Sequence, residues 1–119
     1  MLYQQSVMEI NIMESRNYII ILYDFYNILF SDKQKLYFEE YYFNNLSLGE
    51  ISDNYSLSRN AIHKIIKSMV EKLEYYEDKL KLYEKSIELT KIIDTLDKDT
   101  KEKISKLYLE WSYEFKIRK

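Results

Sequence analysis

The chain has 119 residues, a formal net charge of −2, 46% hydrophobic residues and 32% charged residues. This balance is typical of one globular domain and argues against a disordered chain. Because cysteine is absent and glycine occurs once, the composition excludes disulfides, thiolate metal sites, a cysteine nucleophile and the glycine-rich loops that bind nucleotides.

The spacing of hydrophobic residues predicts an all-α fold. Proline is absent and Gly49 is the only glycine, so almost nothing interrupts a helical run. No segment alternates strictly between apolar and polar residues, and no Asn-Gly or Asp-Gly hairpin signal occurs. The longest apolar run, residues 18–23, is far shorter than the roughly 20 residues of a membrane span, and the N-terminus lacks a signal-peptide pattern. We therefore expect a cytoplasmic protein with no sheet and no membrane span.

Two helices are predicted before residue 45. Residues 1–13 carry no recognisable fold signal, and Met1, Met8 and Met13 are all candidate translation starts. The first helix is expected from about Glu14 to Leu29, with one apolar face made of Ile19, Leu22, Tyr23, Tyr26 and Leu29. A capping box, Ser31 with Gln34, opens the second helix, which is expected to reach about Phe43 with the candidate core residues Leu36, Phe38, Tyr41 and Tyr42.

Residues 47–67 have the pattern of two capped helices separated by one tight turn. Ser47 and Glu50 have the spacing of a capping box, so a helix is expected to begin at Leu48. A turn at residues 55–57 follows, and Ser58 is a candidate cap for the next helix. This layout is a helix-turn-helix.

The outward face of the second helix of this motif is polar and basic. In a helix-turn-helix the N-terminal residues of the second helix face the base edges of the major groove, and the first helix crosses the backbone. The candidate nucleic-acid-binding residues are therefore Ser58, Arg59, Asn60, His63, Lys64 and Lys67. A purely structural pair of helices remains the alternative, since fold and function often separate.

A heptad pattern begins inside the motif and continues beyond it. Apolar residues follow one another at steps of four and three, which predicts a single helix from Arg59 to about Ile93. The pattern, called here the seam, comprises Ile62, Ile66, Met69, Leu73, Tyr76, Leu80, Tyr83 and Ile87. Two partners that do not exclude each other are available to cover it: a second copy of the chain, and the C-terminal segment Asp97–Ile117, with Ile104, Tyr108, Trp111 and Phe115. The length of the seam favours a homodimer, with residues from Met69 to Ile87 as the dimerisation or packing set.

These patterns divide the chain into three parts. They are an N-terminal segment, residues 1–13, a helix-turn-helix domain, residues 14–70, and a helical extension for dimerisation, residues 71–119. Residues 1–58 hold three Lys/Arg and eight Asp/Glu, whereas residues 59–119 hold 15 and 12. This small basic excess, followed on the helix by Glu71 and Glu74, argues against strong non-specific binding of nucleic acid.

No set of residues in the chain has the pattern of a catalytic site. His63 is the only histidine and has no cysteine or second histidine with which to bind zinc. The adjacent carboxylates Glu39–Glu40 and Glu77–Asp78 point about 100° apart on a helix, so neither pair converges on one substrate atom. We therefore expect no enzyme activity, no metal, no cofactor and no small-molecule substrate.

Several blocks of the sequence resemble known bacterial helix-turn-helix proteins. The run from Glu50 to Ile62 resembles the helix-turn-helix of region 4 in bacterial sigma factors. A broader resemblance, over about residues 13 to 96, rests on four blocks: L-Y-D-F-Y at residues 22–26, D-K-Q-K-L-Y-F-E-E-Y-Y at residues 32–42, N-L-S-L-G-E-I-S at residues 45–52 and L-S-R-N-A-I at residues 57–62. Together these blocks resemble the YlxM family. In this chain Ser56 stands where sigma-like turns commonly have glycine, and Ser52 where they have alanine.

The YlxM resemblance implies a sigma-region-4-like, all-α domain with a long helical appendage, usually dimeric. It also implies an accessory or regulatory role in the signal recognition particle pathway, with the GTPase or the RNA of that particle as partner. Two other hypotheses stay open: a dimeric DNA-binding regulator, and a helical scaffold that binds no nucleic acid.

Overall fold

The computed structural model describes the backbone of residues 12–117 and the side chains of residues 15–107. Its elements are α2 (Ile12–Tyr26), the 3-10 helix η1 (Asn27–Leu29), α3 (Asp32–Tyr42), α4 (Leu48–Tyr55), α5 (Arg59–Leu80), α6 (Leu82–Ile93) and α7 (Lys98–Ile117). No strand occurs between residues 12 and 117, which confirms the predicted all-α class. Most of the predicted N-terminal segment, residues 1–11, lies outside the described residues.

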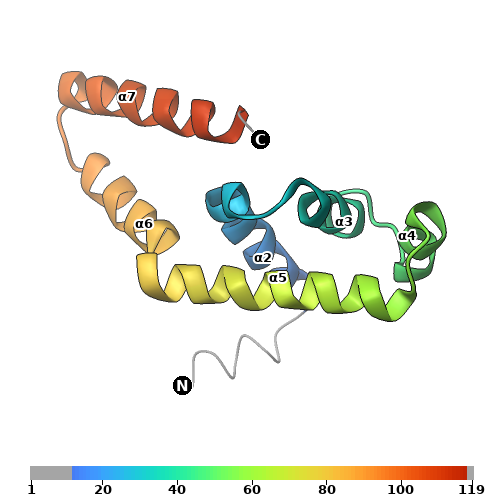
Figure 1. Ribbon diagram of the computed structural model, residues 1–119. Helices are drawn as coiled ribbons and strands as arrows, with labels where there is room; N and C mark the ends of the chain where they lie inside the picture. Colours follow the sequence, from blue (N-terminus) through green and yellow to red (C-terminus); the bar gives the residue numbers. More distant parts are fainter. Residues whose placement is uncertain (1–11, 118–119) are drawn as a thin grey trace.

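Helix α5 forms one side of an elongated molecule with extents of 54 × 37 × 24 Å. Helices α2, α3 and α4 all contact α5 and lie on the same side of it, with α4 at its N-terminal end (Figure 1). Helix α6 leaves the C-terminal end of α5, and α7 turns back after α6. Within the described residues, no helix is long and apolar enough to cross a membrane.

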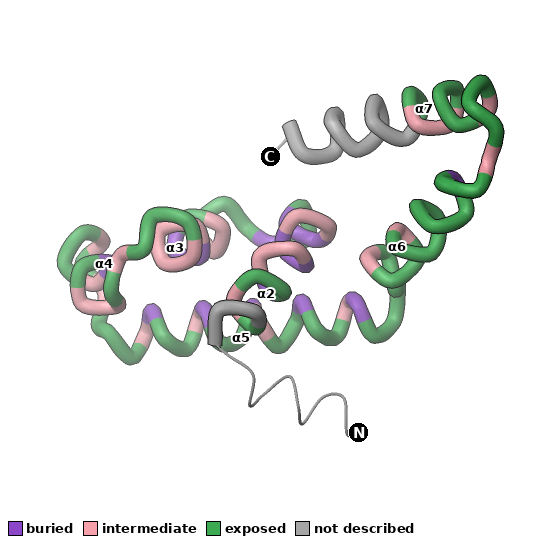
Figure 2. The backbone as a smooth tube through the Cα atoms, turned by 180° about the vertical axis from the view of Figure 1, so that it is seen from behind, coloured by how far each residue is buried: buried purple, intermediate pink, exposed green. Residues whose placement is uncertain are grey.

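The core lies between α5 and the three helices that cover it, and it has two clusters. Figure 2 shows the buried residues of α5 on the side that faces α2, α3 and α4. The larger cluster comprises Ile19, Leu22, Tyr23, Tyr26, Phe30, Phe38, Met69 and Leu73. The smaller cluster comprises Tyr37, Ile51, Ile62 and Ile66.

These clusters correct the expectation about what covers the seam. Its first half is buried by the chain's own N-terminal helices, and neither α7 nor a second chain is needed there. The heptad spacing reports a buried helix face but does not identify the partner that buries it. The division of the chain after residue 70 stays a prediction, although Leu73 and Glu77, which follow it, are buried against the same helices.

Two residues predicted to be in the core are largely exposed. Leu29 is 52% exposed because α2 ends at Tyr26 and the tighter turn of η1 changes the direction of the side chains that follow. Asn27 occupies the buried position instead, and its amide donates to the carbonyl of Tyr23 at 2.9 Å. Leu36 is 41% exposed, since Tyr37 and Phe38 form the core side of α3.

The C-terminal end of α3 is held by a side chain from α2. Arg16 donates to the carbonyl of Tyr41 at 2.8 Å, to the carbonyl of Tyr42 at 2.9 Å and to Oδ1 of Asn45 at 2.9 Å. The last carbonyls of a helix lack partners within the helix and carry partial negative charge, so a guanidinium is well matched to them. This contact fixes the point from which the chain enters the helix-turn-helix.

The prediction of a single helix from Arg59 to about Ile93 is wrong, because the helix is interrupted at Lys81. This residue has φ 56°, in the left-handed region, and it ends α5 and precedes α6. The break is called here the elbow, and it consists of Tyr26, Glu77 and residues 81–84. Nothing in the local sequence marks it, because neither glycine nor proline is present there.

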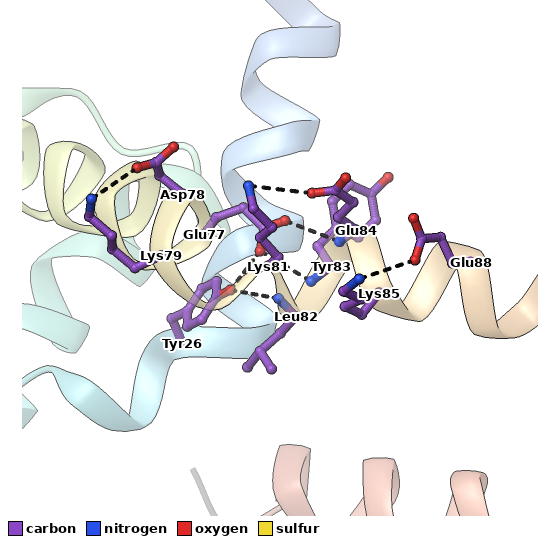
Figure 3. A network of polar contacts seen from close by, with 10 residues as sticks. All are labelled: Tyr26, Glu77, Asp78, Lys79, Lys81, Leu82, Tyr83, Glu84, Lys85 and Glu88. Atoms are coloured by element: carbon purple, nitrogen blue, oxygen red, sulfur yellow. Dashed lines mark hydrogen bonds and ion pairs between the residues drawn. The ribbon is translucent and has the colours of Figure 1, made fainter.

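Contacts from other parts of the chain stabilise the elbow (Figure 3). The Glu77 carboxylate accepts from the Tyr26 hydroxyl at 2.5 Å, from the Tyr83 backbone N–H at 3.1 Å and from the Glu84 backbone N–H at 3.0 Å. The Leu82 N–H donates to the Tyr26 hydroxyl oxygen at 3.1 Å. These bonds satisfy the first N–H groups of α6, whose own N-cap residue makes no side-chain cap.

The C-terminal helix begins at Lys98, one residue after the predicted start. Asp97 accepts the Thr100 N–H at 3.0 Å, and α7 contacts α6. The covering set expected from the sequence includes Tyr108, Trp111 and Phe115, which lie outside the residues whose side chains are described.

Candidate nucleic-acid interface

Both helices of the predicted helix-turn-helix begin at the expected caps. The Ser47 hydroxyl accepts the Glu50 N–H at 3.1 Å, and the Glu50 carboxylate accepts the Ser47 N–H at 3.0 Å. The Ser47 backbone N–H is the main cause of a lowered pKa for the Glu50 carboxyl. The Ser58 hydroxyl accepts the Ala61 N–H at 3.0 Å at the start of α5. The capping box and the second cap are therefore confirmed, and α4 and α5 have the predicted starts.

The turn between α4 and α5 keeps the left-handed conformation although it has no glycine. Ser56 has φ 57° and ψ 38°, where a residue with a Cβ carries a cost of about 1 kcal/mol. The Ser52 hydroxyl donates to the Leu57 carbonyl, and the Leu57 N–H donates to the Ser52 carbonyl at 3.3 Å. The two departures from the sigma-like pattern are thus linked, because the hydroxyl of Ser52, on α4, stabilises the turn in which Ser56 is left-handed.

Apolar contacts orient α4 against α5. Ile51 on α4 and Ile62 on α5 are both fully buried in the smaller core cluster. Tyr55, at the end of α4, packs edge-on against Tyr37 with ring centroids 5.4 Å apart, and its hydroxyl donates to Glu40 at 3.2 Å. The angle between the two helices of the motif is therefore set by the core and by α3.

The six candidate binding residues lie together on the first turns of α5. All are exposed, and they comprise Ser58, Arg59, Asn60, His63, Lys64 and Lys67. Apart from the Ser58 cap, none of their side chains forms an ion pair or hydrogen bond with another described residue. Their donors and positive charges face solvent, while their role in binding stays a prediction.

The charge along the exposed side of α5 changes sign after two turns. The first turn contains no acidic residue. Glu71, Glu74 and Asp78, further along the helix, are all exposed. Because these carboxylates repel phosphate, a nucleic acid meets a favourable surface only at the N-terminal end of α5.

The predicted dimerisation and packing residues separate into three groups. Met69 and Leu73 are fully buried within the chain. Tyr76 and Tyr83 are half-buried and pack against the larger core cluster. Leu80 is 53% exposed and Ile87 is 39% exposed, so only these two present free apolar surface.

Sequence reasoning missed two structurally important residues, Gly49 and Glu77. Gly49 lies beneath the Arg59 guanidinium, and its signal in the sequence was a lone glycine inside a capped helix. Glu77 appeared in the sequence only as one of two adjacent carboxylates with no catalytic pattern, but it is buried at the elbow. Among the residues that the structure describes, no group of three or more His, Cys, Asp or Glu is placed to hold a metal ion.

A short helix, α4, is joined by a three-residue turn to the longer helix α5, which exposes its polar N-terminal turns, and this arrangement defines a helix-turn-helix protein. Residues 13–110 match the model of the family UPF0122, described as "Putative helix-turn-helix protein, YlxM / p13 like". The chain belongs to this family, which confirms the resemblance noted from the sequence.

Similar proteins occur in several bacteria. A UPF0122 protein of Caldanaerobacter subterraneus subsp. tengcongensis is 43% identical over 79 residues, which are 66% of this chain and 68% of the relative. One of Bacillus licheniformis is 46% identical over 79 residues, or 66% and 74% of the two chains. One of Oceanobacillus iheyensis is 43% identical over 91 residues, or 72% and 87%.

Proposed function

We propose that this chain is a regulatory protein that binds duplex DNA through the first turns of α5. The observation that carries the proposal is the group of exposed polar and basic side chains on those turns, none of which is neutralised by a described acidic residue. In a helix-turn-helix this part of the second helix enters the major groove.

The residue types suit separate tasks in that groove. Asn60 carries an amide, the group that pairs with adenine through two hydrogen bonds, and Arg59 carries the guanidinium that pairs with guanine or phosphate. His63 follows one turn later and adds a donor or acceptor. Lys64 and Lys67 lie at positions where an ammonium reaches the sugar-phosphate backbone.

A selection from genomic fragments at ~50 mM salt tests the proposal, because phosphate-driven binding is strongest at low salt. We expect a sequence to be enriched. Replacing Lys64 and Lys67 with alanine is then expected to reduce the slope of log K against log salt by about 2, or about one for each lost phosphate contact.

The matched control removes the same charge elsewhere. Lys91 and Lys103 are exposed and make no described ion pair, so their double alanine variant should bind like the wild type. If no fragment is enriched, or if the two double variants bind alike, the proposal that DNA binds the first turns of α5 is refuted.

We also propose that the protein forms a homodimer through the helical extension, residues 71–119, which is called here the appendage. Exposed apolar side chains gather at the end of α5 and along α6, namely Leu80, Leu82, Ile87, Leu89 and Ile92. Covering such side chains stabilises an association by about 25 cal/mol for each Å² of apolar surface removed from water. Two copies also match the two half-sites that helix-turn-helix proteins usually read.

Sedimentation equilibrium tests the dimer. The double variant Leu80→Glu, Ile87→Glu is expected to sediment as a monomer, because two carboxylates would be desolvated in the interface. Leu36→Glu, at a position on α3 that is 41% exposed, is the control and should leave the wild-type mass unchanged. A wild-type chain that is monomeric at every concentration refutes the proposal.

A second candidate function is an accessory role in the signal recognition particle pathway. Its support is the YlxM family membership together with the net charge of −2, which is low for a protein that depends on DNA phosphate alone. The GTPase or the RNA of the particle would then contact the first turns of α5 or the appendage.

A pull-down from a bacterial lysate distinguishes this candidate from the first. Recovery of the targeting GTPase or the particle RNA, lost in the Lys64→Ala, Lys67→Ala variant, supports it. Recovery of neither contradicts it, whatever the outcome of the DNA selection.

A further inference from the structure

Gly49 is the only glycine of the chain, and it occupies the second position of α4. Its φ is not positive, so its backbone conformation is open to any residue. Glycine is a poor helix former compared with alanine. The backbone therefore gives no reason for glycine here, and the reason must lie in the space around it.

The Arg59 guanidinium fills that space. A Cβ built on Gly49 would lie 2.7 Å from Nη2, 3.0 Å from Cζ and 3.0 Å from Nε of Arg59. All three distances are shorter than ordinary van der Waals contacts. The guanidinium of Arg59, the first residue of α5, thus lies beside the first turn of α4, in the space that the Cβ of any other residue at position 49 would enter.

The Arg59 guanidinium has no stronger described partner than this contact. The guanidinium forms no ion pair and no hydrogen bond with another described residue, and a free arginine side chain has large rotamer entropy. Nearby, the Glu50 carboxylate accepts the Ser47 N–H as part of the capping box. The donors of Arg59 are therefore left available.

We propose that Gly49 is a positioning residue that holds the Arg59 guanidinium over the start of α4, ready to bind a DNA phosphate. In a helix-turn-helix the DNA backbone crosses the first helix while the second helix lies in the groove, so a cation held between the two helix starts meets that strand. The inference rests on the proposed DNA binding. It adds that one cation of the interface is fixed before DNA arrives, which lowers the entropy lost on binding.

A double-mutant cycle on the full-length protein, with the DNA fragment enriched in the selection, tests the inference. Gly49→Ala is expected to weaken binding about tenfold, the size of one displaced charge-assisted hydrogen bond. In the Arg59→Ala background the same substitution is expected to have no further effect. Asn54→Ala, an exposed position on the same helix, should bind like the wild type.

Two further measurements separate positioning from folding. Urea unfolding of Gly49→Ala should show stability equal to or above the wild type, since alanine favours the helix. Without DNA, the Nε–Hε group of Arg59 should show a higher NMR order parameter in the wild type than in Gly49→Ala. Equal order parameters in the two proteins overturn the inference even if no DNA is bound.

The binding outcomes also distinguish the two proposals. If the wild type binds no DNA, the proposed function fails, and the NMR comparison still decides the role of Gly49. If Arg59→Ala weakens binding but Gly49→Ala does not, only the role of Gly49 is refuted. An equal loss for Gly49→Ala in both backgrounds also refutes it, because the added methyl group would then act on the DNA directly.

Discussion

Replacing Glu77 with alanine is expected to destabilise the elbow and release the start of α6. The side chain is 9% exposed, and its two oxygens accept three hydrogen bonds, one from the Tyr26 hydroxyl and two from the backbone of residues 83 and 84. Alanine leaves these donors without their acceptor. The Leu82 N–H keeps the Tyr26 oxygen as its partner.

The size of the effect follows from those bonds. A hydrogen bond to a charged group contributes about 1.5–3 kcal/mol, and loss of a helix cap costs about 1 kcal/mol. The contributions share one carboxylate and do not add, and water can reach the freed N–H groups of α6. We expect the free energy of unfolding to fall by about 2–4 kcal/mol for Glu77→Ala. Glu77→Gln, which keeps one acceptor oxygen, should lose about half as much.

Urea unfolding gives the global loss, and hydrogen exchange gives the local one. The amides of residues 83 and 84 should exchange faster in Glu77→Ala than in the wild type, while the amides in the middle of α5 should change only with the global stability. Glu74→Ala is the control, because Glu74 is exposed one turn earlier, and it should change stability by less than about 0.5 kcal/mol. Unchanged stability together with protected amides at residues 83 and 84 would show that Glu77 does not cap α6.

Three further predictions concern the turns, a cap and buried hydroxyls. Ser56→Gly and Lys81→Gly should each raise the free energy of unfolding, measured with urea, by about 0.5–1 kcal/mol, because φ values of 57° and 56° suit glycine. A lower free energy of unfolding for either variant contradicts this. Ser47→Ala should lower the unfolding free energy by about 1 kcal/mol, and an unchanged urea midpoint would mean that the capping box contributes nothing. Burial raises the pKa of Tyr23 and Tyr26 above the ordinary value of 10.0, so the folded chain keeps protons that the unfolded chain releases. This contribution is complete below the unfolded pKa and is lost as pH rises above it, by about 1.4 kcal/mol per pH unit for each tyrosine. Tyr26→Phe should therefore weaken the fall in stability measured by urea unfolding above about pH 10, and an unaltered pH slope contradicts this.

The local parts of the fold could be predicted because they depend on neighbouring residues. Ser31 and Ser47 each form a capping box with the residue three positions later, exchanging hydrogen bonds with its side chain and its N–H group. The whole signal therefore lies within four consecutive residues. The buried face of α5 was also readable, since Ile62, Ile66 and Met69 keep the spacing of a helix.

The elbow could not be predicted, because the residues that hold it are distant in sequence. Tyr26 and Glu77 are 51 residues apart, and the heptad spacing continues across Lys81 without interruption. A tertiary hydrogen-bond network here overrides a helical pattern that is locally favourable. The same reason explains the wrong choice of partner for the first half of the seam, since periodicity shows that a face is buried but not which helix covers it.

The candidate site likewise has a part that the sequence predicts and a part that it does not. Arg59, Asn60 and His63 could be placed on the outward face from the period of the helix, and the structure brings them together there. The contact of Arg59 with Gly49 joins two helices across a turn, so only the three-dimensional structure shows it. Sequence reasoning thus named the exposed groups but not what orients them.

Helix α5 connects the candidate reading surface to the elbow without interruption. Its 22 residues, at about 1.5 Å each, make a rod of about 33 Å. If two chains pair through α6, a change of about 3° at each elbow moves each start of α5 by about 1.7 Å, and the distance between the two starts by about 3.4 Å, the rise of one base pair. Substitutions at Tyr26 or Glu77, at the opposite end of the rod from the DNA, are then expected to change the preferred distance between half-sites by a base pair and to leave each half-site sequence unchanged.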